Sequence, residues 1–101
     1  MAIGAKGVIS VAANIVPADV TSMVHAARDG EWEKAQELHY KLWPLCKALF
    51  LETNPIPVKT SMKILGLING ELRLPLCDAQ AGTVEKLTKA LQAYGLEVPV
   101  A

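Results

Sequence analysis

Apolar residues dominate one stretch near the start of the chain and recur with a helical period in the rest of it. The stretch GVISVAANIVPAD, from Gly7 to Asp19, holds β-branched side chains with small residues between them, and Pro17 stops it. Near-continuous apolarity of this kind is typical of a strand that is covered on both faces, as in a parallel sheet. We therefore predict one β-strand within this stretch.

Helical periods follow this strand. The first helix is predicted from Pro17 to about Gly30, and its stripe consists of Val20, Met23, Val24 and Ala27. The second runs from about Glu31 to about Phe50, and its stripe consists of Trp32, Ala35, Leu38, Leu42, Leu45 and Leu49. We expect Pro44 to bend the second helix and the short connection to make an antiparallel hairpin of the two.

Prolines and glycines divide the second half of the chain. The connector LETNPIPVK leads to a third helix from about Pro57 to Leu65, and an extended LRLPL piece follows. The last helix is predicted to begin after Gly82, with Thr83 as its cap, and to end at Gly95. The predicted fold is mostly α, with one N-terminal strand-like segment and four helices. A single strand cannot satisfy its own backbone, so it pairs with another copy, is covered by the helices, or belongs to something larger.

Composition places the chain among small globular proteins, since its 101 residues are 51% hydrophobic and 20% charged. Ten basic and ten acidic residues balance, so the chain lacks the charged surface that nucleic acid or an anionic membrane requires. The start MAIGAKG does not resemble a secretory signal, and no stretch reaches the ~20 apolar residues of a membrane span. We expect a cytoplasmic protein with neither nucleic acid nor membrane as a partner.

The titratable residues give little support for a metal or cofactor site. The best available ligands are His25, His39, Cys46 and Glu52. His39 and Cys46 are seven residues apart on a helix, two turns from each other, which is a poor chelate spacing. Cys46 and Cys77 lack CxxC spacing and are expected to be reduced thiols. Nucleotide, dinucleotide, hydrolase and zinc-protease motifs are absent from the sequence, so no cofactor is expected.

Two features leave alternatives open. Lys59 follows a proline-rich connector, where a buried lysine would suit a Schiff base. Its place in the first turn of a helix favours instead a solvated lysine or one bonded to loop carbonyls, and Lys6 is interpreted as a surface residue.

The stretch AARDGEWEKAQELHYKL is similar to one helix-turn-helix of a tetratricopeptide-type repeat, but no second copy follows at a spacing of ~34 residues.

Several motifs together carry a family resemblance. They are IGAKGVISVAAN, WPLCKALF, LETNPIPVK, SMKILGL and ELRLPL. In order and spacing, from about Ile3 to about Leu96, they resemble the C-terminal third of the dihydrodipicolinate synthases, relatives of N-acetylneuraminate lyase. The resemblance implies a (β/α)₈ barrel followed by a small helical domain. Residues 7–14 would then be the eighth barrel strand. Residues 1–30 would be the remnant of the last barrel unit, and residues 31–101 the C-terminal helical domain.

The same resemblance implies a chemistry. Members of the family condense pyruvate with aspartate semialdehyde in diaminopimelate and lysine biosynthesis, and they hold pyruvate as a Schiff base on a lysine of the sixth strand. That lysine and its proton relay have no counterpart in these 101 residues. Ile9 aligns with an isoleucine that borders the pyruvate pocket. We expect this chain alone to be inactive and to associate with itself or with synthase subunits through its uncovered strand. The alternatives are a helical interaction module and, with less support, an enzyme that uses Lys59.

Overall fold

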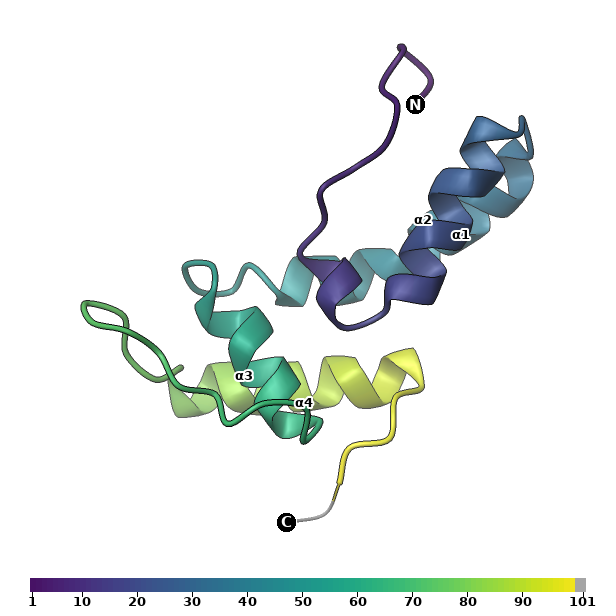
Figure 1. Ribbon diagram of the computed structural model, residues 1–101. Coiled ribbons are helices and arrows are strands. Elements are labelled where there is room, and N and C mark those ends of the chain that lie inside the picture. Colours follow the sequence, from purple (N-terminus) through teal and green to yellow (C-terminus); the bar gives the residue numbers. More distant parts are fainter. Residues whose placement is uncertain (100–101) are drawn as a thin grey trace.

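The computed structural model describes residues 1–99, in which helices dominate (Figure 1). In chain order these are the short 3₁₀ helix η1 (Ala12–Asn14) and the α-helices α1 (Pro17–Arg28), α2 (Trp32–Ala48), α3 (Ile56–Ile64) and α4 (Ala81–Tyr94). A mostly α chain with four α-helices is therefore confirmed.

The strand predicted over residues 7–14 is absent from the described part of the chain, which is a correction. Residues 5–10 run as an irregular extended segment, and Ala12–Asn14 form η1 instead. A strand needs a neighbour that bonds its amides and carbonyls, and residues 1–99 contain no other strand. We refer to residues 1–10 as the N-terminal arm, which projects away from the helices in Figure 1.

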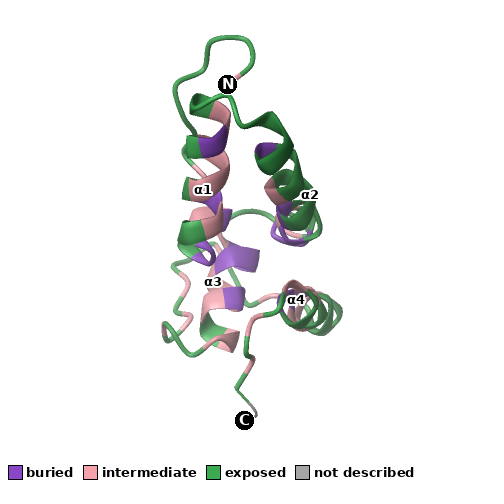
Figure 2. Ribbon diagram, turned by 90° about the vertical axis from the view of Figure 1, so that its right-hand side faces the viewer, coloured by how far each residue is buried: buried purple, intermediate pink, exposed green. Residues whose placement is uncertain are grey.

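The helices α1 and α2 form the antiparallel hairpin that the short connection predicts (Figures 1 and 2). At the turn, Gly30 has a φ of +79°. The amides of Glu31 and Gly30 donate to the carbonyls of Ala26 and Ala27, at 2.8 and 3.3 Å. This is the Schellman arrangement, whose left-handed residue is usually glycine because a side chain there would be strained.

The helix α2 continues through Pro44. A proline inside a helix costs about 3 kcal/mol, partly because the carbonyl four residues earlier, here that of Tyr40, loses its partner. Leu42, Leu45 and Leu49 lie on both sides of the proline and are all buried. Since a buried leucine contributes about 1.5 to 3 kcal/mol, packing outweighs the penalty and the helix persists.

One shared core holds η1 and the four α-helices together, and Figure 2 shows the buried residues on their inward faces. Its members are Ala12, Ile15, Val16, Val20, Leu42, Leu45, Ala48, Leu49, Val58, Leu87 and Leu91. Within the predicted stripe of α2, Ala35, Leu42, Leu45 and Leu49 are buried, Leu38 is half-buried, and Trp32 is 47% exposed. Trp32 is the first residue of α2 and therefore lies at the tip of the hairpin.

The start of α4 differs from the prediction. The helix begins at Ala81 and includes Gly82, so Thr83 lies in the first turn and is not the cap. The residue before the helix, Gln80, is extended, and its amide donates to Oε2 of Glu52 at 3.0 Å. A carboxylate at this end of α4 both accepts a hydrogen bond and complements the helix dipole.

The molecule is elongated. Its radius of gyration is 14.6 Å and its principal extents are 41, 29 and 20 Å, whereas a compact domain of this size has a radius of about 13 Å. Both the arm and the elongated bundle leave apolar surface uncovered. In the described residues, no helix combines the length and apolarity that crossing a membrane requires.

One enclosed polar side chain has no protein partner. Ser61 of α3 is 0% exposed, and its Oγ makes no hydrogen bond within the described chain. An unsatisfied buried hydroxyl costs about 1 to 3 kcal/mol.

Replacing this hydroxyl tests that cost. Ser61→Ala should leave the free energy of unfolding unchanged or raise it by about 1 kcal/mol, because the orphaned group is removed with little loss of packing. Urea denaturation followed by circular dichroism measures the change. Ser61→Val is the contrasting variant, and overpacking should lower its stability by about 1 to 3 kcal/mol. A loss of more than about 1 kcal/mol in Ser61→Ala would show that the hydroxyl has a stabilising partner.

Candidate interaction surface

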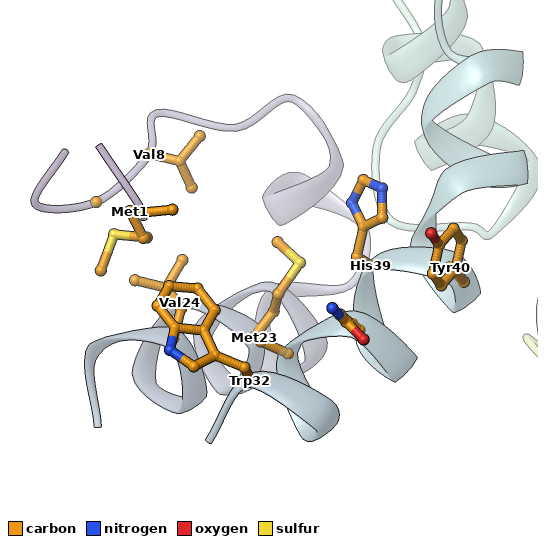
Figure 3. Close-up of a pocket in the computed structure, with 12 residues that line it drawn as sticks. Met1, Val8, Met23, Val24, Trp32, His39 and Tyr40 are labelled. Atoms are coloured by element: carbon orange, nitrogen blue, oxygen red, sulfur yellow. The ribbon is translucent and has the colours of Figure 1, made fainter. Parts of the chain in front are cut away.

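An apolar cavity of about 440 Å³ lies between the N-terminal arm and the helical hairpin. The arm contributes Val8, α1 contributes Met23 and Val24, and α2 contributes Trp32, His39 and Tyr40. Figure 3 shows Val8 and Met23 on opposite sides of this open space. A cavity with carbon-rich walls and few polar groups favours an apolar occupant, such as a packed protein segment.

Aromatic side chains extend this surface along α2. The ring of His39 lies 5.2 Å from that of Tyr40, in an edge-on arrangement, and 6.4 Å from that of Trp43. Tyr40, Trp43 and Phe50 are all exposed, although aromatic side chains supply much of the apolar area in cores and interfaces. The side of α2 that bears Tyr40 and Trp43, with Phe50 just beyond the end of the helix, is therefore a second candidate for burial by protein.

The site residue singled out from the family resemblance, Ile9, lies in the arm beside Val8 and is fully exposed. Lys59 bonds to a loop carbonyl, which is one of the roles that its position favours. It is half-buried on α3, and its Nζ donates to the backbone carbonyl of Glu71. Lys6 is exposed in the arm. The structure does not bring these three residues together at a reactive centre.

The candidate metal ligands also lie apart. Residues 1–99 contain no group of three His, Cys, Asp or Glu side chains placed to hold a metal ion. Cys46 and Cys77 are free thiols, and burial raises the pKa of the Cys46 thiol. Glu52 is engaged with the start of α4. The surface therefore offers apolar contact area rather than a ligand set.

A polar junction joins three helices on another part of the molecule. Lys41 Nζ of α2 donates to Oδ2 of Asp19 of α1 at 3.0 Å, and the hydroxyl of Tyr94 of α4 donates to the same oxygen. The Lys41 ammonium also lies 4.9 Å from the centroid of the Tyr94 ring, within the range of a cation–π contact. Asp19 and Tyr94 are 75 residues apart in the sequence, and no local pattern in it indicates that they meet.

The ionisation of this junction follows its geometry. The hydrogen bonds from Tyr94 and then Lys41 hold the pKa of the Asp19 carboxyl below its ordinary value. Burial, followed by the hydrogen bond to Asp19, raises the pKa of Tyr94. At neutral pH, Asp19 is therefore an anion and Tyr94 a neutral donor.

Comparison with known proteins gives the class of protein. The family model described as the dihydrodipicolinate synthetase family matches residues 1–94. The chain is 54% identical to 4-hydroxy-tetrahydrodipicolinate synthase of Methanococcus vannielii, over 95% of this chain and 33% of that enzyme. The chain belongs to the dihydrodipicolinate synthetase family.

Solved structures agree in fold. Dihydrodipicolinate synthase from Aquifex aeolicus matches with a TM-score of 0.94 and 46% identity, over 98% of this chain and 34% of that one. A variant described as the first monomeric dihydrodipicolinate synthase matches with a TM-score of 0.91 and 47% identity, over 95% of this chain and 32% of that one. The chain spans about a third of the length of these relatives.

Proposed function

We propose that these residues form the C-terminal part of a 4-hydroxy-tetrahydrodipicolinate synthase. In this proposal, residues 1–30 complete the last strand and helix of a (β/α)₈ barrel, and residues 31–101 form the helical domain that follows. The complete cytoplasmic enzyme condenses pyruvate with aspartate semialdehyde through a Schiff-base lysine. The present polypeptide alone lacks that lysine and is inactive.

The observation that carries this proposal is the uncovered arm. Val8 and Ile9 are β-branched and exposed, and residues 5–10 are extended without forming a sheet. Burial of such side chains is worth about 1.5 to 3 kcal/mol each, so a segment of this kind favours a fold that supplies neighbouring strands. The adjoining apolar cavity supports the same conclusion, because the rest of a barrel would fill it.

Ile9 has the specific role in this proposal. In a complete barrel it would border the pyruvate pocket near the carboxyl end of the last strand, where barrels of this class place their sites. An apolar side chain there shapes the pocket and excludes water, and it takes no part in proton transfer.

A chimera tests the proposed activity. The part of the Methanococcus vannielii synthase that precedes the matching region is joined to this chain at the boundary of the match. We expect the chimera to turn over pyruvate and aspartate semialdehyde, and to trap pyruvate when borohydride is added. The reason is that the chimera again holds the lysine nucleophile together with the part of the pyruvate pocket that this chain supplies. The 101-residue chain alone should show neither turnover nor an adduct by mass spectrometry. Turnover by the chain alone would refute the proposal of inactivity, and an inert but folded chimera would refute the assignment.

Ile9 is tested in the same chimera. Ile9→Asp should raise the KM for pyruvate about fivefold to a thousandfold, because like charges about 4 Å apart repel by roughly 1 to 4 kcal/mol. Ile3→Asp is the matched control, since Ile3 is an isoleucine of the same arm with equal exposure, and it should leave the KM unchanged. Equal effects of the two variants would exclude the specific role of Ile9.

A second function, self-association, is favoured by the exposed arm and the aromatic side of α2. Without the rest of a barrel, the arm presents unpaired backbone groups and apolar side chains, which pair readily with another chain. We propose that the isolated chain forms dimers or larger assemblies through the arm, which agrees with an interaction module as the alternative function.

Light scattering across a range of protein concentrations measures this association. The unaltered chain should be larger than a monomer, and the double variant Val8→Lys, Ile9→Lys should shift towards the monomer, because charges on the arm oppose its burial. Leu74→Lys, which adds charge at an equally exposed leucine of the loop before α4, should not shift it. A monomeric unaltered chain at all concentrations would contradict the proposal.

A further inference from the structure

The ion pair at Asp19 differs from the other ion pairs of residues 1–99 in what it connects. Arg28 pairs with its neighbour Asp29, and Lys89 pairs with Glu85 one turn away on α4. Such local, exposed pairs contribute little to tertiary structure. The pair between Lys41 and Asp19 joins two helices, and the hydroxyl of Tyr94 brings in a third.

The junction lies at the end of α4, where it can constrain the residues that follow this helix. Tyr94 is the last residue of α4, and Gly95 then turns the backbone with a φ of +104°. Beyond the turn, Leu96 and Val98 pack against the core. A cavity of about 350 Å³ remains beside the junction, between the start of α1 and the end of α4, so apolar packing at this point is incomplete.

Apolar packing and hydrogen bonding constrain such a contact differently. Burial of apolar area is non-directional and tolerates small shifts of one helix over another. A hydrogen bond weakens steeply when its angle departs from linearity. The Asp19 side chain is 28% exposed and the Lys41 side chain is 51% exposed, so their attraction adds modest stability while still requiring a defined geometry.

We propose that Asp19 is an orientation clamp that fixes the end of α4, and with it residues 95–98, against the start of α1 and the middle of α2. The core supplies most of the folding free energy, and the clamp selects one arrangement among those that the core permits. The charged and titratable groups at the clamp are Asp19 from α1, Lys41 and Cys46 from α2, and Tyr94 from α4.

The clamp has a defined dependence on pH. The pKa of Asp19 is lowered in the fold from an ordinary value of 3.8, so its stabilising effect is complete above that value and is lost as the pH falls through the folded-state pKa. Tyr94 has a raised pKa and keeps its proton through the neutral range. The clamp is therefore closed at neutral pH and opens in acid.

Amide hydrogen exchange of the full 101-residue chain tests the clamp. At pH 7, Tyr94→Phe and Asp19→Asn should each speed exchange in residues 91–98 about tenfold, because each removes a hydrogen bond to a charged group. Exchange in α3, which lies outside the junction, should not change. The double variant should be no faster than the faster single variant, since both remove the same interaction. In the unaltered chain, exchange in residues 91–98, corrected for its intrinsic rate, should rise below about pH 4, and Asp19→Asn should show no such step.

Asp29→Asn is the matched control, because it removes an exposed carboxylate whose partner Arg28 is adjacent in sequence. It should leave exchange in residues 91–98 unchanged. Unchanged exchange in Tyr94→Phe, or an equal rise in all helices, would overturn the clamp. If Asp19→Asn loses its helical circular dichroism, Tyr94→Phe decides alone, because it keeps the ring and removes the hydroxyl.

Discussion

The burial of one face of α2 is the constraint on which the rest of this structure depends. Leu42, Leu45 and Leu49 lie in the centre of the shared core, and the helix that bears them packs against α1 on one side and α4 on another. This burial keeps α2 continuous through Pro44, since three buried leucines outweigh a penalty of about 3 kcal/mol. It also explains the single core, because α1 and α4 pack against α2, and α3 packs against α4.

The N-terminal arm, in contrast to that face of α2, carries apolar side chains that are not buried. Its side chains are of the type that fills a sheet, yet Ile9 is fully exposed and residues 5–10 form no strand. Strand formation depends on hydrogen bonds between segments, whereas a helix satisfies its backbone from within. The helices therefore form in this chain while the arm stays extended and open. The chain that carries this arm belongs to the dihydrodipicolinate synthetase family and spans about a third of the length of its relatives.

Stability and orientation come from different interactions. The core is apolar and tolerant of small displacements, whereas the junction at Asp19 links three helices through hydrogen bonds of defined direction. The exposed aromatic side of α2 is a third element, because the ring of His39 lies near those of Tyr40 and Trp43 and none of the three is buried. The molecule thus combines a shared apolar core with two exposed apolar surfaces, one at the arm and one along α2.

The sequence by itself determined the first two helices, because the apolar stripes at Val20 and Leu45 and the glycine at position 30 act within a few residues of the chain. Its ordered motifs also determined the family. Only the tertiary structure decided that the apolar start is an open arm and that Trp32 is exposed at the tip of the hairpin. It also brought Asp19 to Tyr94, which is 75 residues away. These features depend on contacts between distant segments, and the local pattern of apolar residues does not indicate which segments meet.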